Sequence, residues 1–134
     1  MITNDRTTWP SGDRLWSIAQ AIAIAEGYDR PNSNPFHLNN PGDISDGDAQ
    51  FGGEPHSGSN VTHFPDAQTG WQWLYDKLSR IANSQSAVYS PSMTWTELAK
   101  KWAGNWVVWV ANVTKELGVS PDSTFEEYVQ GGQS

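Results

Sequence analysis

The residues best suited to chemistry are carboxylates in two places along the chain. Glu26 ends an apolar stretch, residues 15–25, and is followed by Gly27. The other acids of interest gather between residues 31 and 68, where no Lys or Arg accompanies them: Asp43, Asp46, Asp48, Glu54 and Asp66. A carboxylic acid with a raised pKa beside an ionised carboxylate is an arrangement suited to general acid catalysis.

Residues 11–27 are predicted to form the helix that carries Glu26. Apolar residues recur three and four positions apart along it, which is the spacing of a helix with one buried face. Ser11 or Asp13 can cap its start, and Gly27 is a typical residue just beyond a helix end. Glu26 then lies in the last turn, where the helix dipole and the apolar neighbours both disfavour a negative charge. We therefore expect the pKa of Glu26 to be raised.

Most of the chain outside residues 31–68 is also predicted to be helical. Apolar spacing and capping residues place further helices from Asp66 or Thr69 to Asn83, from Thr94 to Ala103, from Asn105 as cap to Gly118, and shortly after Ser123. Thr94 with Glu97, and Ser123 with Glu126, fit the capping-box pattern. The valines between residues 107 and 113 also suit a strand, but the length of the segment and its Lys-Glu-Leu-Gly ending favour a helix.

Residues 31–68 differ from the helical part. They contain five of the eight prolines and all three histidines, but none of the eight tryptophans. So long an irregular stretch is usually functional or carries small strands, and Phe51–Gly53 and Val61–Phe64 are candidate strands of a hairpin. The predicted fold class is mainly α (α+β). Residues 1–134 form one domain, with an N-terminal extension at 1–10 and a frayed tail at 131–134.

The composition excludes several classes of protein. With no cysteine, disulfide scaffolds and zinc sites built on cysteine are excluded. The longest apolar run, residues 106–113, is too short to span a membrane, and the first nine residues lack the features of a signal peptide. A net charge of −7 with no basic run argues against a nucleic-acid partner. We expect a monomer.

No metal or cofactor is predicted. The histidines lie at 37, 56 and 63, which is not a recognised zinc-ligand spacing. If Asp43 began a calcium-binding loop of the EF-hand type, the sixth position would need a glycine, but it is Asp48. Calcium binding is therefore not expected, and the histidines are interpreted as loop residues, of which His37 and His63 could still touch a substrate.

Most of the eight tryptophans are expected in the core, because each buries a large area. Trp71 and Trp73 are two residues apart and cannot share one helix face. One of them should be at least half exposed. Trp16 and Trp73 are weaker candidates for contacts with a ligand or partner.

Three motifs in order resemble the lysozyme superfamily of phage and bacterial cell-wall enzymes. They are Ala25-Glu26-Gly27-Tyr28, then Leu38-Asn39-Asn40-Pro41-Gly42-Asp43-Ile44, then His63-Phe64-Pro65-Asp66-Ala67-Gln68-Thr69-Gly70-Trp71. The stretch from Met93 to Ser123 is similar to the closing helices of that family. No single motif is unique, but their order and spacing together are fairly specific.

The resemblance implies a lysozyme-like helical lobe with a small β-hairpin or loop region lining a glycan cleft. It implies cleavage of the β-1,4 bond after N-acetylmuramic acid in peptidoglycan, at the cell wall, with Glu26 as general acid. Asp43 is either a second carboxylate or a turn residue, and Asp66 is a helix cap rather than a substrate contact. The substrate contacts that it suggests are Tyr28, His37, Asn39, Asn40, His63, Gln68 and Trp102. Relatives usually carry Tyr at the position of Trp102.

Several alternatives stay open at this point. The reaction could be hydrolysis, as in muramidases, or the internal cyclisation of lytic transglycosylases, which need a single carboxylate. The same fold also serves chitin, so a chitinase-type glycosidase is the nearest rival. A non-catalytic wall-binding or virion structural module that kept the fold is the rival from a different class.

Overall fold

The computed structural model describes residues 13–30, 32–43, 54–55 and 62–131 of the 134. Their elements are α1 (Arg14–Glu26), α2 (Asn34–His37), β1 (Glu54–Pro55), β2 (Thr62–His63), α3 (Ala67–Ala82), α4 (Trp95–Trp102), α5 (Trp106–Leu117) and α6 (Phe125–Val129). The described part is mainly helical, as predicted. None of its helices is long and apolar enough to cross a membrane.

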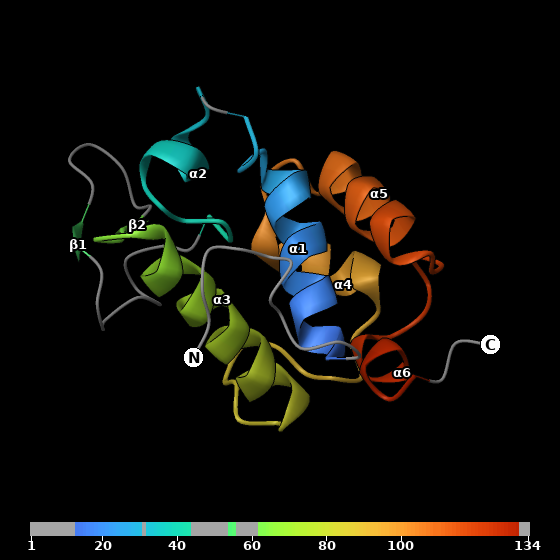
Figure 1. The fold of residues 1–134 in the computed structure, drawn as a ribbon. Coiled ribbons are helices and arrows are strands. Elements are labelled where there is room, and N and C mark those ends of the chain that lie inside the picture. The colour runs from blue at the N-terminus through green and yellow to red at the C-terminus, as the bar shows by residue number, and fades with distance from the viewer. Residues whose placement is uncertain (1–12, 31, 44–53, 56–61, 132–134) are drawn as a thin grey trace.

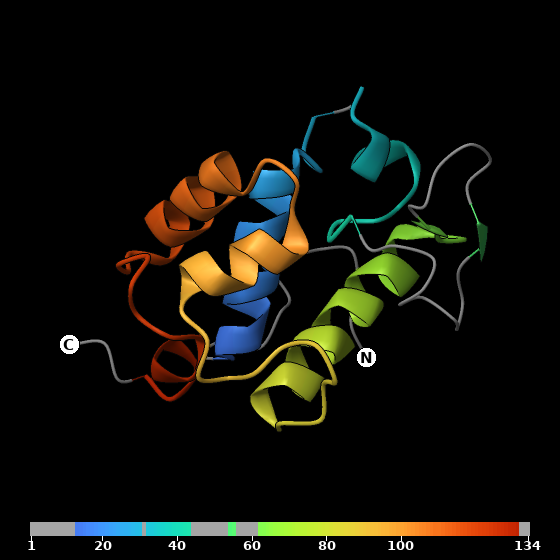
Figure 2. The same cartoon turned by 180° about the vertical axis from the view of Figure 1, so that it is seen from behind.

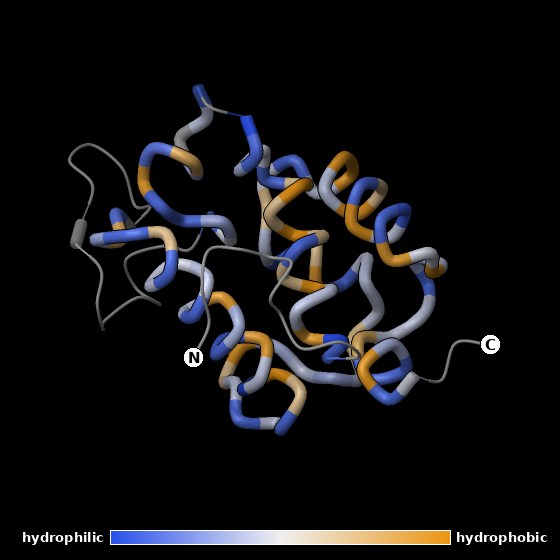
Figure 3. The backbone as a smooth tube through the Cα atoms, viewed as in Figure 1, coloured by the Kyte–Doolittle hydropathy of each residue, from blue (hydrophilic) through white to orange (hydrophobic). Residues whose placement is uncertain are grey.

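Helix α1 is central to the arrangement. It packs against α5 on one side and α3 on the other, and α6 lies near its N-terminal end (Figure 1). Helices α4 and α5 pack against each other, and in the reverse view α4 crosses in front of α1 while α5 lies beside it (Figure 2). Apolar positions recur between polar ones along α3 and α5 (Figure 3), the spacing that gives a helix one core-facing side. Residues 107–113 lie within α5, so the prediction of a helix rather than a strand is confirmed there.

Most helix ends follow the predicted capping chemistry. Asp13, not Ser11, caps α1: its carboxylate accepts a hydrogen bond from the Leu15 amide at 3.0 Å. Ser11 lies outside the described residues. Gly27 ends α1 with a φ of 79°, a left-handed conformation that glycine adopts without strain. Asp66 caps α3, and Thr94 and Glu97 form the expected capping box of α4.

Two capping predictions are wrong. Asn105 precedes α5 but makes no side-chain capping bond, because its backbone (φ −94°, ψ 59°) is not in the extended conformation of a typical cap. The capping box of α6 uses Thr124 and Glu127, one residue later than expected. The helices that were predicted begin within three residues of the expected positions.

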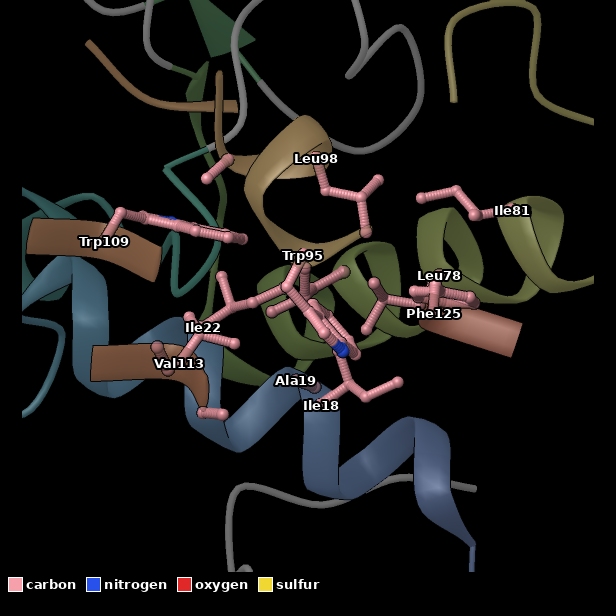
Figure 4. Packing of buried hydrophobic residues seen from close by; sticks show 14 of the residues in the cluster. Ile18, Ala19, Ile22, Leu78, Ile81, Trp95, Leu98, Trp109, Val113 and Phe125 are labelled. Carbon is pink, nitrogen blue, oxygen red and sulfur yellow. The ribbon is translucent and has the colours of Figure 1, made fainter. Parts of the chain in front are cut away.

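The core lies where α1 meets the other helices. Its wholly buried side chains include Ile18, Ile22, Leu78, Trp95 and Phe125, which interlock from α1, α3, α4 and α6 (Figure 4). Burial of apolar surface on this scale is the main force that holds the helices together.

Three tryptophans test the expectations for exposed aromatic rings. Trp16 is buried and its ring lies 4.1 Å from that of Tyr75, so its predicted role at a groove is wrong: the helix turns it into the core. Trp71 is fully buried, whereas Trp73 is half-buried beneath the guanidinium of Arg80 at 4.8 Å. The two rings therefore differ in burial, as their spacing predicts, but Trp73 is partly buried against the core rather than half exposed.

The segment between α2 and α3 folds back on itself. The Phe64 amide donates to the Leu38 carbonyl at 2.9 Å, and the Asn39 side-chain amide donates to the Phe64 carbonyl at 3.1 Å. A Cβ on Gly70 would collide with the Asn39 carbonyl oxygen, so glycine is required where α3 passes beneath this turn.

Strands β1 and β2 pair antiparallel, with Glu54 opposite His63 and Pro55 opposite Thr62. The second strand falls within the predicted 61–64. The first was predicted at 51–53, which lies outside the described residues.

Candidate functional site

A cavity of about 260 Å³ lies between the end of α1, the turn at residues 40–43 and the junction of α4 with α5. Its lining combines two carboxylates with two indoles and small or apolar groups: Ala25, Glu26, Asp43, Trp102, Ala103, Gly104, Asn105, Val108 and Trp109. The two residues proposed from sequence as catalytic, Glu26 and Asp43, thus share one cavity.

Glu26 reaches the cavity because it occupies the last turn of α1. Its Oε2 atom accepts a hydrogen bond from the indole Nε1 of Trp109 at 3.0 Å. The pKa of Glu26 is raised from its ordinary 4.5 to about 8: burial is the largest cause, the negative charge of Asp43 acts in the same direction, and the Trp109 bond opposes both. Glu26 is therefore a neutral acid at neutral pH, able to donate a proton.

Asp43 enters the cavity from the turn. Its backbone has a φ of 51°, an uncommon conformation that Asp tolerates better than most residues, and its amide donates to the Asn40 carbonyl at 3.1 Å. Burial raises the pKa of Asp43 above its ordinary 3.8. The negative charge of Asp43 is one of the causes that raise the pKa of Glu26 to about 8. Asp43 is thus the group that ionises first as pH rises.

Two indoles form one wall of the cavity. The rings of Trp102 and Trp109 have centroids 5.7 Å apart and planes inclined by 30°. Trp102 also donates from Nε1 to the Gly42 carbonyl at 3.0 Å, so that α4 holds the turn bearing Asp43. Aromatic rings beside a cavity can stack on the apolar face of a sugar.

The other predicted substrate contacts do not line this cavity. Tyr28 is buried, with its ring 5.2 Å from that of Trp71. Asn40 is wholly buried and the Asn39 side chain donates to the Phe64 carbonyl, so both asparagines help to build the turn, and their contact with a substrate stays a prediction.

His37, His63 and Gln68 also lie away from the cavity. The two histidines are exposed, on α2 and β2, and Gln68 is half-buried in the first turn of α3. None of the three is among the residues that line the cavity, so their contact with a substrate stays a prediction. Trp102, by contrast, lines the cavity, as the resemblance suggested.

Sequence reasoning missed Trp109. It was counted among the core tryptophans, and it is indeed 3% exposed. Its position three residues after Trp106 is the spacing of a buried helix face. Only the crossing of α5 over the end of α1 directs its N–H group to Glu26, and no local pattern encodes that crossing.

Within the described residues, no three side chains of His, Asp or Glu gather as metal ligands would. The acids considered for calcium at 46 and 48 lie outside those residues. No protein-family model, curated protein or solved structure matches this chain.

Proposed function

We propose that this chain is a glycosidase that cleaves the β-1,4 bond between N-acetylmuramic acid and N-acetylglucosamine in peptidoglycan, with Glu26 as general acid. The observation that carries the proposal is a buried acid with a pKa of about 8, placed in a cavity beside a second carboxylate. Pairs of carboxyl groups whose environments separate their roles are typical of enzymes that cleave glycosidic bonds.

The chemistry divides between the two carboxyl groups. Neutral Glu26 gives its proton to the glycosidic oxygen as the bond to the anomeric carbon breaks, and becomes a carboxylate. The Trp109 N–H group remains bonded to it and stabilises that charge. Ionised Asp43 stabilises the positive charge on the sugar or orients the water that attacks it.

The surroundings suit a sugar substrate. The Trp102 and Trp109 indoles and Val108 offer apolar surface, while the carboxyl groups offer hydrogen bonds. The mixture is typical of ligand sites, in which a few polar groups orient a ligand against an apolar lining. The order of the sequence motifs at residues 25–28 and 38–44 supports peptidoglycan as the polymer.

The test compares the native chain with Glu26→Gln on a suspension of purified bacterial walls. Gln keeps the shape and can accept the Trp109 bond but cannot donate a proton, so clearing should fall by about 10²–10⁴-fold, the usual contribution of a general acid. Glu116→Gln, an exposed site on α5, is the control and should clear walls normally. Native-like clearing by Glu26→Gln would overturn the assignment.

Two further measurements refine the reaction. Mass spectrometry of released fragments separates reducing ends, made by hydrolysis, from anhydro ends, made by cyclisation. Asp43→Asn then tells whether a second carboxylate is needed: loss of activity supports two groups, and full activity supports one. Sedimentation with walls without clearing, or release of fragments from chitin alone, would replace the proposed activity with binding or chitin cleavage.

A further inference from the structure

Lys77 is a cation on the inner side of α3. Its side chain is only 8% exposed, which is rare for lysine unless the charge is compensated. Its Nζ atom lies over two aromatic rings, 4.5 Å from the centroid of Trp102 and 5.2 Å from that of Tyr89. Attraction between a cation and an aromatic face strengthens when water is excluded, so Lys77 holds these rings firmly.

The ring beneath Lys77 is the one that touches both halves of the cavity. Trp102 donates to the Gly42 carbonyl, next to Asp43. It also packs on the Tyr89 ring and on the Trp109 ring, whose N–H group donates to Glu26. A movement of Trp102 would therefore change the surroundings of both carboxyl groups, although Lys77 itself does not line the cavity.

We propose that Lys77 is a positioning residue that fixes the Trp102 indole and, through it, the relative placement of Glu26 and Asp43. The expected effect of Lys77 on the rate of wall cleavage rests on the proposed function. Its effect on the positions of Trp102 and the two carboxyl groups does not. Small displacements of catalytic groups cost large factors in rate.

A second cation on the same helix provides a matched comparison. Arg80 lies three residues after Lys77, and its guanidinium covers the Trp73 ring at 4.8 Å. Neither Arg80 nor Trp73 lines the cavity. Removing Arg80 loses one cation–aromatic contact from α3 and removing Lys77 loses two, but only the loss of Lys77 should change the surroundings of Glu26.

The experiment uses Lys77→Met, which keeps the aliphatic stem and removes the charge, with Arg80→Met as control and Lys77→Arg as the charge-keeping variant. Indole N–H signals are followed by NMR, assigned with Trp102→Phe and Trp109→Phe, and Glu26 is titrated through its carboxyl carbon. Lys77→Met should shift the Trp102 and Trp109 signals and change the Glu26 titration.

On walls, the kcat of Lys77→Met should fall about tenfold with little change in KM, because positioning is lost rather than binding. Lys77→Arg should restore most of kcat, and Arg80→Met should change none of these.

Lys77→Gln covers the case in which Lys77→Met does not fold, because it removes the charge but keeps a polar side chain, and it should cause the same changes. Tyr89 is left unchanged, since its ring packs directly on Trp102 with centroids 5.5 Å apart. Unmoved Trp102 signals and an unchanged Glu26 titration in the folded variants would overturn the proposal. If those signals move in a protein that never cleaves walls, the positioning role stands and the proposed function fails.

Discussion

Glu26 and Asp66 are both acids at helix ends, but their pKa values are shifted in opposite directions. Glu26 lies in the last turn of α1, buried against Trp109, and its pKa is raised to about 8. Asp66 lies at the exposed start of α3, where its carboxylate accepts from the Thr69 amide at 2.7 Å and its pKa is lowered. Helix polarity favours a negative charge at the start of a helix and disfavours it at the end.

The difference separates a structural acid from one suited to catalysis. The charge of Asp66 is satisfied by its own helix, so it has no proton to give at neutral pH. Glu26 keeps its proton because ionising it inside the cavity is costly. A site that keeps an acid in this state reduces the stability of the folded chain, a common consequence of active-site chemistry.

Glu26→Gln should give the largest change in stability. Because the folded pKa is raised, the folded state holds a proton that the unfolded state releases, so stability is lost as pH rises from 4.5 to about 8. Gln has no proton to lose. The variant should be more stable than the native chain by roughly 2–4 kcal/mol above that window, since each unit of pKa corresponds to about 1.4 kcal/mol.

Urea unfolding at about pH 4 and about pH 9 measures this difference directly. The two proteins should agree most closely at the acid end, and Glu116→Gln should follow the native chain at both. Equal loss of stability by Glu26→Gln and the native chain between the two pH values would show that Glu26 is not buried as an acid.

Trp109→Phe should have an intermediate effect. The indole bond favours the ionised form of Glu26, so its loss should raise the pKa of Glu26 further, by about one pH unit for a hydrogen bond to a charged group. Phe keeps a ring beside Trp102. Carboxyl-carbon NMR of Glu26 measures the pKa, and Trp106→Phe, three residues earlier on α5, is the control. A lower pKa in Trp109→Phe would contradict the proposed balance of causes.

The helices and Glu26 were predictable because their signals are local. Apolar spacing, capping residues and Gly27 specify α1 and place Glu26 at its end, and the same reasoning gave Asp66 as the cap of α3. The roles of Trp109 and Lys77 were not predictable. Each depends on which residues of another helix lie opposite, and that is decided by packing over long sequence distances.

The turn at residues 38–43 shows a different limit of prediction from sequence. The pattern around Asn39 and Asn40 indicated a functional turn, but it could not separate the residues that build the turn from those that face the cavity. Asn40 is buried and Asn39 bonds the Phe64 carbonyl, while Asp43 is the turn residue that lines the cavity. A short polar side chain can satisfy local backbone groups as readily as a ligand.

Asp66→Ala should give the smallest change and the opposite pH dependence to Glu26→Gln. Because the folded pKa of Asp66 is lowered, its stabilising effect is present above its ordinary value of 3.8 and is lost as pH falls through the folded pKa. Thermal unfolding should show Asp66→Ala to be less stable than the native chain at neutral pH and equal to it in strong acid. Asp66→Asn retains a good capping oxygen without the charge, so it should lose less stability at neutral pH. If Asp66→Ala were equally destabilised at both pH values, the capping charge would not be the cause, and the contrast with Glu26 would rest on burial alone.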